Sequence, residues 1–225
     1  MLKGVIFDMD GTITLTENLH HQAFAAIFKR YGIHYSLQDH LARFAGAGSK
    51  AIFTTIFAEN RKKMNEGDRE ACIQEKRDLY TKFVQETEIK TVPGAPIFIK
   101  RIHDAGLKNI IATGNSNLDI VRSILKRVGL DVYFPDIVSI TEVAHGKPFP
   151  DVFLEAARRM GCAPNECVVL EDAVNGVESA RSAHIRCIAF ETTSKKEDLL
   201  KAGASLVLPD YTFLTDDILY EKVHA

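Results

Sequence analysis

Short apolar runs alternate with helix-like stretches over the second half of the chain, and this alternation restricts the possible folds more than any other feature. The apolar runs hold four or five residues, and most of the intervening stretches repeat apolar side chains at helical spacing before a glycine. Such alternation is typical of a parallel β-sheet covered by helices on both faces. The pattern predicts strands at 109–113, 137–140, 167–170, 186–190 and 205–208, and helices at 97–105, 118–128, 151–160, 174–183 and 196–202.

The first half of the chain has a different pattern. Residues 2–8 are apolar and predict one further strand, whereas residues 16–88 contain only helix-like segments. The stretch TVPGAP at 91–96 is typical of a turn. We therefore expect an α/β protein with a Rossmann-like parallel sheet core, residues 1–15 and 89–225, and a helical domain, residues 16–88, inserted after the first strand. The connections near 14–16 and 88–93 would act as hinges.

The ends of two predicted helices carry recognisable signals. Gly32 follows a run with apolar side chains at helical spacing, so it predicts the end of the first helix of the inserted domain. Ser116 and Asp119 are spaced as in a capping box, so they predict that Ser116 caps the helix at 118–128.

Composition and charge narrow the function classes. The chain has 225 residues, a net charge of −2 and a sequence pI of about 6.4, so we expect no basic surface for nucleic acid. No apolar run approaches the length of a signal peptide or a membrane span, so we expect no membrane association. The four cysteines lack Cys-x-x-Cys spacing, which indicates unpaired thiols in a reducing cytoplasm.

Polar residues follow the carboxyl ends of the predicted strands, where open α/β sheets bind their ligands. The residues at or beside these ends are Asp8, Asp10, Thr113, Gly114, Asn115, Lys147, Glu171 and Asp172. Two carboxylates 4 Å apart repel each other by about 4 kcal/mol at an effective dielectric constant of 20. Four such acids near one lysine therefore call for a cation, and their hard oxygen atoms suit Mg²⁺. The bound cation would attract phosphate, which Gly11 and Gly114 allow to approach the backbone closely.

Each of these short motifs also has an ordinary structural explanation. Asp-x-Asp-Gly can build a turn, Thr113-Gly114-Asn115 a loop, and Glu171-Asp172 a helix N-terminus favoured by the helix dipole. Their joint occurrence, each at a predicted strand end or in the adjoining loop, favours a functional site.

Four stretches together resemble the signature motifs of the haloacid dehalogenase superfamily. They are VIFDMDGTIT, IIATGNS, GKPFPDVFLEAA and VVLEDAVNGVESA. The resemblance extends over essentially the whole chain and is strongest to the β-phosphoglucomutase-like phosphatases. It identifies the inserted segment, residues 16–88, with that family's α-helical cap domain.

The resemblance implies specific roles for the strand-end residues. Asp8 is expected to be the nucleophile that forms an aspartyl phosphate, and Asp10 the general acid and base. Mg²⁺ would be held by the Asp8 carboxylate, the Asp10 backbone carbonyl and Asp172, with Glu171 in support. Lys147 would neutralise charge on Asp8 and on the transferring group. An acid at position 10 favours phosphoryl transfer over carbon–halogen cleavage, which needs no proton for the leaving group.

The resemblance also implies how the phosphoryl group and the substrate are bound. Thr113 and nearby backbone amides would bind the phosphoryl oxygens. The expected substrate-binding residues are Gly11, His20, Gly46, Lys76, Gly114 and Asn115. His20 and Lys76 lie in the cap, where a solvent-exposed helix face is an equally ordinary explanation, and whether they or Lys50 contact substrate stays open.

Two positions depart from the mutase pattern. The mutases carry an arginine three residues after the cap glycine, where this chain has Ser49 followed by Lys50, and they tend to have Asp where Leu15 stands. A lysine cannot reproduce the bidentate fork of an arginine.

Three functions follow from these patterns. The first is a Mg²⁺-dependent phosphatase acting on a small phosphomonoester, such as a sugar phosphate, and the second is a β-phosphoglucomutase. The third is a binding or regulatory protein on an inactive enzyme fold, which the complete set of catalytic residue types disfavours. We expect a cytoplasmic protein, a monomer or weak homodimer, whose partner is a small phosphorylated metabolite.

Overall fold

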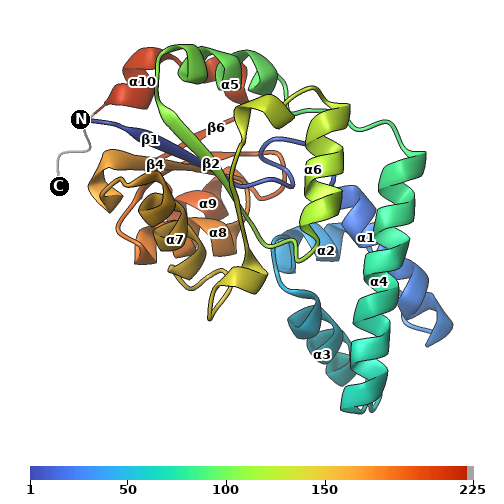
Figure 1. Ribbon diagram of the computed structural model, residues 1–225. Helices are drawn as coiled ribbons and strands as arrows, with labels where there is room; N and C mark the ends of the chain where they lie inside the picture. The colour runs from blue at the N-terminus through green and yellow to red at the C-terminus, as the bar shows by residue number, and fades with distance from the viewer. Residues whose placement is uncertain (222–225) are drawn as a thin grey trace.

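A six-stranded parallel sheet forms the centre of the molecule (Figure 1). The computed structural model describes residues 1–221, and the strand order is β3-β2-β1-β4-β5-β6. This arrangement confirms the predicted α/β fold with a parallel sheet. The strands are β1 (Gly4–Phe7), β2 (Lys108–Thr113), β3 (Ile137–Ser139), β4 (Cys167–Glu171), β5 (Arg186–Phe190) and β6 (Leu206–Leu208).

Helices cover both faces of the sheet because successive side chains of each strand point to opposite faces. In β1, Val5 and Phe7 pack in one hydrophobic cluster and Ile6 packs in another. The first cluster includes side chains of α5 (Ala95–Asp104), α6 (Leu118–Arg127) and α10 (Asp216–Tyr220). The second includes side chains of α7 (Asp151–Met160), α8 (Val174–Ser182) and α9 (Lys196–Ala202).

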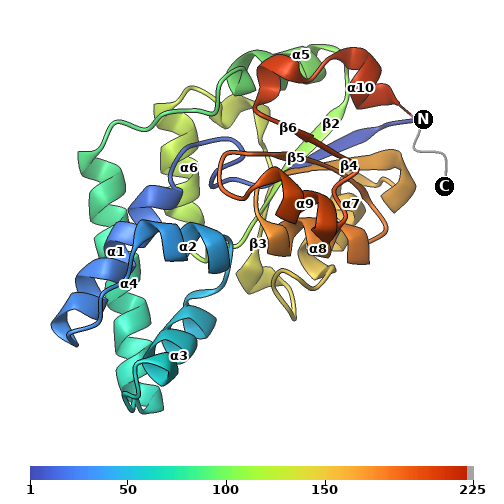
Figure 2. The same ribbon diagram turned by 180° about the vertical axis from the view of Figure 1, so that it is seen from behind.

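The segment between β1 and α5 folds into helices that lie to one side of the sheet (Figures 1 and 2). These are α1 (Glu17–Arg30), α2 (Leu37–Arg43), α3 (Ser49–Glu59) and α4 (Glu66–Glu86). They enclose a hydrophobic cluster of their own, in which Phe53 makes edge-to-face contacts with Phe24 and Phe28. The helical segment therefore has its own core.

The two connections between the sheet and the helical segment run side by side. Thr14 and Thr91 form an isolated antiparallel bridge. The backbone N–H of Leu15 donates to the carbonyl of Lys90 at 2.8 Å, and that of Val92 donates to Ile13 at 2.9 Å. The chain thus leaves and re-enters the sheet layer through one hydrogen-bonded pair of segments. That these segments act as hinges stays a prediction.

Most predicted elements agree with the structure to within two residues at each end, and α6 begins at Leu118 as predicted, but its N-cap residue was predicted wrongly. Asn117, not Ser116, is the N-cap, and its side chain accepts hydrogen bonds from the backbone N–H groups of Asp119 and Ile120. The sequence pattern also did not predict α10. Short 3₁₀ turns complete the structure at Asp131–Tyr133, Ile140–Glu142, Pro164–Glu166 and Tyr211–Phe213.

The cysteines agree with the prediction of unpaired thiols. All four cysteines, which are Cys72, Cys162, Cys167 and Cys187, are free and buried. None of the helices within residues 1–221 combines the length and apolar character that a membrane crossing requires. The cytoplasmic location stays a prediction.

Candidate active site

Three adjacent strands bring most of the predicted strand-end residues to one edge of the sheet. Strand β1 pairs with β2 on one side and β4 on the other, in parallel register. Asp8 directly follows β1, Thr113 ends β2 and Glu171 ends β4. From β1 the chain passes to β2 and β3 on one side of the sheet, and then to β4, β5 and β6 on the other. α/β sheets form binding crevices where the strand order reverses in this way.

Lys147 joins the ends of two strands. Its ammonium group donates to Asp8 Oδ1 and to Glu171 Oε1, the latter at 2.7 Å. Its side chain is 4% exposed and reaches the sheet from the loop before α7. Burial lowers the pKa of Lys147, but the two carboxylates raise it more, so the net shift is upward. Lys147 is therefore held as a cation between two acids.

The Asp8 carboxyl is difficult to ionise in this arrangement. Burial raises its pKa to about 8, and the nearby acids Glu171 and Asp10 add to the shift, although Lys147 opposes it. A further positive charge beside Asp8 would lower this pKa and favour the ionised carboxylate at neutral pH.

Glu171 is fixed by the backbone of the chain that follows it. Its Oε2 accepts hydrogen bonds from the N–H groups of Asp172 at 2.7 Å and Ala173 at 2.9 Å. Gly176 in α8 leaves the space that the carboxylate occupies, because a Cβ there would lie 1.8 Å from Glu171 Oε1. The absence of a side chain at position 176 therefore makes room for the Glu171 carboxylate.

Asp8, Glu171 and Asp172 form a group that could hold a metal ion. One carboxylate oxygen from each lies within 4.8 Å of the others, and all three residues are buried. Asp172 Oδ1 accepts a hydrogen bond from Thr12 at 2.8 Å, whereas its buried Oδ2 has no hydrogen-bond partner within residues 1–221. Burial, together with Glu171 and Asp8, raises the pKa of Asp172 well above its usual value, and the nearby hydroxyls of Thr193 and Thr12 offset part of that shift. A hard cation fits an unpartnered buried oxygen in such an acidic group.

Asp10 faces the helical segment and not the metal-binding group. Its Oδ1 accepts hydrogen bonds from the hydroxyls of Thr16 and Tyr80, the latter at 3.1 Å, and lies 3.4 Å from His20 Nε2. Burial would raise the pKa of Asp10, but His20 and the two hydroxyls lower it to about 2. Two acids that are two residues apart thus have opposite pKa shifts.

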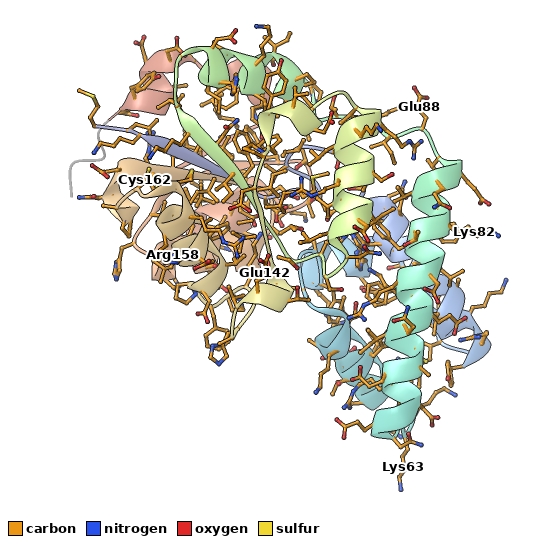
Figure 3. All side chains as sticks on the ribbon, viewed as in Figure 1. Lys63, Lys82, Glu88, Glu142, Arg158 and Cys162 are labelled. Atoms are coloured by element: carbon orange, nitrogen blue, oxygen red, sulfur yellow. The ribbon has the colours of Figure 1, made fainter. Side chains whose placement is uncertain are left out.

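The helical segment contributes a buried lysine to the same region. Lys76 of α4 is 6% exposed, and its Nζ lies 2.5 Å from His20 Nδ1. Its ammonium group lies 4.7 Å from the centre of the Phe24 ring. Burial lowers the pKa of Lys76 to about 8, although Glu17 and Asp10 oppose this shift. Other lysines of this segment, Lys63 and Lys82, project away from the sheet (Figure 3).

The family of the chain follows from its match to a known protein family. The model of the haloacid dehalogenase-like hydrolases matches residues 2–184 of the chain. The chain belongs to the haloacid dehalogenase-like hydrolases. The resemblance inferred from the four sequence motifs is therefore confirmed, and so is the prediction of an enzyme of this superfamily.

Several named proteins are similar to this haloacid dehalogenase-like hydrolase in sequence or in structure. Fructose-1-phosphate phosphatase YqaB of Escherichia coli is 35% identical over 182 residues, which cover 80% of this chain and 92% of the relative. Protein SUPPRESSOR OF QUENCHING 1, chloroplastic, of Arabidopsis thaliana is 31% identical over 93% of this chain, but the chain spans 20% of that protein's length. A crystal structure of β-phosphoglucomutase from Clostridium difficile has a TM-score of 0.87 at 23% identity, covering 99% of this chain and 97% of the other, so this likeness concerns the fold.

One cavity between sheet and helical segment gathers most of the predicted site residues of this haloacid dehalogenase-like hydrolase. Those lining it are Asp8, Asp10, His20, Gly46, Lys76, Gly114, Asn115, Lys147 and Glu171. The predicted residues Gly11, Thr113 and Asp172 lie outside this lining. Thr113 is buried, and its hydroxyl accepts a hydrogen bond from the N–H of Asn115 at 3.0 Å. A Cβ on Gly11 would lie 1.9 Å from Asp172 Oδ2, so this glycine makes room for the acidic group.

The loop at 46–50, which lacks the mutase arginine, lies close to the sheet domain. Gly46 has a positive φ of 69°, and a Cβ there would lie 2.7 Å from Asn175 Oδ1 of the sheet domain. Ser49 lines the cavity, whereas Lys50 is exposed and lies outside its lining. The nearest cation in the sequence therefore does not take the arginine's place.

Sequence patterns missed several residues of the site. Thr16 and Tyr80 bond to Asp10, while Glu17 and His40 line the cavity and bond to each other. His40 lies in α2 and Tyr80 in α4, far along the chain from Thr16 and Glu17, and no spacing rule connects them. Gly176 carried a detectable signal, because a glycine inside a predicted helix often has a packing role.

Proposed function

We propose that this protein is a Mg²⁺-dependent phosphatase that hydrolyses a small phosphomonoester, with sugar phosphates as the favoured class, through an aspartyl phosphate on Asp8. The observation that carries the proposal is the arrangement of Asp8, Lys147 and Glu171 in one cavity with Asp10. A nucleophile, a fixed cation and a separate acid–base group are the parts that phosphoryl transfer requires.

The metal site of this proposal uses the Asp8 and Asp172 carboxylates and the Asp10 carbonyl, with Glu171 in support. The unpartnered Asp172 Oδ2 and the raised pKa values of Asp8 and Asp172 support a cation there. When bound, Mg²⁺ supplies positive charge that offsets the acids and favours an anionic phosphoryl group. The chemistry of the oxygen donors favours Mg²⁺ over softer metals.

The first half of the reaction transfers the phosphoryl group to the protein. An Asp8 carboxylate oxygen attacks phosphorus, the bond to the substrate oxygen breaks, and Asp10 gives that oxygen its proton. Asp10 is ionised at neutral pH in this structure because its pKa is about 2. An anionic phosphoryl group that enters the cavity would raise this pKa and favour the protonated form that the first half needs.

The second half returns Asp8 to its starting state. Asp10 takes a proton from a water molecule, the water oxygen attacks phosphorus, and the bond between phosphorus and Asp8 breaks to release inorganic phosphate. Lys147 holds Asp8 in place and offsets charge in both halves. Thr113 and the backbone N–H groups near Gly114 and Asn115 would bind the phosphoryl oxygens.

We also propose that residues 16–88 act as a cap domain over a core formed by residues 1–15 and 89–225. Three observations support this division: the separate hydrophobic cluster, the paired connections, and the cavity lined from both sides. Within the cap, Gly46 brings its loop close to the core, and His20 and Lys76 would contact the substrate.

The alternative is a β-phosphoglucomutase, in which a sugar hydroxyl and not water accepts the phosphoryl group. The absence of the mutase arginine disfavours it, because Lys50 lies outside the cavity lining. The cations Lys76 and Arg77 do line the cavity, but they come from α4 and not from the loop at 46–50. Ser49, which lines the cavity, carries no charge. The proposal therefore assigns the second attack to water.

A phosphate-release screen tests the proposal. The purified protein with Mg²⁺ is incubated with sugar phosphates, nucleotides and small phosphorylated acids, and a coupled assay follows the isomerisation of β-glucose 1-phosphate. We expect release of inorganic phosphate from at least one sugar phosphate without isomer formation. Accumulation of glucose 6-phosphate without free phosphate would instead identify a mutase.

A further inference from the structure

Glu17 is a cavity-lining acid that the proposed chemistry does not use. It lies in the first turn of α1, and its side chain is 11% exposed. It lines the same cavity as Asp8 and Asp10. A buried carboxylate is costly unless its oxygens find partners, so the contacts of Glu17 need an explanation.

One oxygen of Glu17 is held by a buried histidine. Glu17 Oε1 lies 2.8 Å from His40 Nε2, and His40 Nδ1 lies 2.8 Å from the hydroxyl of Tyr35. His40 is 1% exposed. Burial, with Glu17 nearby, raises the pKa of Tyr35, so Tyr35 remains a donor. The tyrosine O–H can donate to Nδ1 and the histidine N–H to Glu17, which fixes the orientation of the carboxylate.

The other oxygen of Glu17 is uncommitted. Within residues 1–221, the carboxylate makes no side-chain hydrogen bond besides that to His40, and no lysine or arginine nitrogen lies within 4.0 Å of it. Lys76 is close enough to feel its charge, but the Lys76 ammonium bonds to His20. The protein thus holds an oriented anion at the cavity wall with one oxygen free to accept a hydrogen bond.

We infer that Glu17 is a specificity-determining residue whose free oxygen accepts a hydrogen bond from a hydroxyl group on the organic part of the substrate. The inference rests on the proposed phosphatase function and specifies its substrate class. An ionised carboxylate only accepts hydrogen bonds, so it selects hydroxyl donors and repels an anionic group at the same place. The substrate is then a monophosphate of a polyhydroxylated carbon chain, with His40 as a positioning residue.

Kinetics of Glu17→Gln with two kinds of substrate test the inference. The probes are p-nitrophenyl phosphate, which has no alcohol hydroxyl, and the best substrate among glucose, fructose, ribose and glycerol monophosphates. Loss of a charge-assisted hydrogen bond should lower kcat/KM for that polyol phosphate about tenfold or more. The value for p-nitrophenyl phosphate should change less than about twofold. Glu70→Gln, an exposed charge change on α4, is the matched control and should change neither.

A second variant keeps the test independent of any folding defect in the first. His40→Phe retains an aromatic ring but removes the contact with Glu17, so it should raise KM for the polyol phosphate and leave p-nitrophenyl phosphate hydrolysis unchanged. Equal losses on both substrates in both variants, or no loss on the polyol phosphate, would overturn the inference while the phosphatase function stands. If the wild-type protein hydrolyses neither probe, the proposed function fails and the inference fails with it.

Discussion

Asp8 and Asp10 are two residues apart, yet their surroundings drive their pKa values in opposite directions. Asp8 is buried among acids with Lys147 as its one cationic partner within residues 1–221, and its pKa rises to about 8. Asp10 is surrounded by His20 and two hydroxyls, and its pKa falls to about 2. Pairs of acids separated in this way commonly divide nucleophilic and acid–base roles.

Replacing Asp8 by Asn should remove the nucleophile with little change in shape. We expect turnover to fall by at least about 10³-fold, because no other group can form the covalent intermediate. Circular dichroism should match the wild-type protein, and phosphate release measures the loss. Residual turnover within tenfold of wild type would exclude Asp8 as nucleophile.

The buried Lys76 should reduce the free energy of unfolding at neutral pH. Its pKa falls from 10.5 to about 8 on folding, so the folded state resists the charged form. The destabilisation by Lys76 is fully present below pH 8, where the lysine is charged in the folded and unfolded states. It disappears as the pH rises towards 10.5, where the lysine is neutral in both states. Lys76→Met should therefore raise the free energy of unfolding by up to about 3 kcal/mol at pH 7, with the gain shrinking towards pH 10.

Urea denaturation at several pH values measures this gain. Lys82→Met is the control, because Lys82 is 63% exposed and should show no such pH-dependent difference. A Lys76→Met variant that is less stable than the wild-type protein at pH 7 would contradict the expectation.

The sequence permitted prediction of the strand-end residues but not of their partners. Asp8, Thr113 and Glu171 follow apolar runs, and parallel strands must bring their carboxyl ends to one edge. Glu17 and His40 meet only because α1 and α2 pack together, which depends on the tertiary arrangement of the helical segment. Contacts between individual residues of the helical segment could therefore not be predicted from spacing alone.

At the level of elements, strands and long helices were predictable because their hydrophobic periodicity is strong. The α6 cap was not, since Ser116 and Asn117 are both good N-cap residues and the position of the loop after β2 decides between them. The five-residue α10 is too short for a periodic signal.

Gly176 shows how an element can be shaped for its site. Replacing a helical glycine by alanine ordinarily stabilises a helix by about 1 kcal/mol. In Gly176→Ala, however, the new Cβ would displace Glu171 from Lys147, so we expect activity to fall about 10²-fold.

Gly67→Ala in α4 is the matched substitution. A Cβ at Gly67 would have its nearest neighbour at 3.4 Å, so this variant should gain stability and keep its activity. Phosphate release and thermal unfolding measure both variants. Full activity in Gly176→Ala would show that the position of Glu171 does not matter for catalysis.

At the scale of the whole molecule, the acidic group should couple metal binding to folding. A cation that binds the folded state alone adds about 2.7 kcal/mol of stability at a hundred times its Kd. We therefore expect Mg²⁺ to raise Tm, and Asp172→Ala to abolish the rise by removing the unpartnered oxygen. Excess chelator should stop turnover in the wild-type protein. An unchanged Tm over a wide Mg²⁺ range would contradict the metal site.

The central claim is a covalent phosphoenzyme on Asp8. Brief incubation with a phosphomonoester and Mg²⁺, followed by an acid quench and borohydride reduction, converts an aspartyl phosphate into homoserine, which peptide mass spectrometry can locate. We predict homoserine at position 8, only when substrate is present and not in Asp8→Asn. Sustained phosphate release with Asp8 unmodified, or homoserine at another aspartate, would contradict the account.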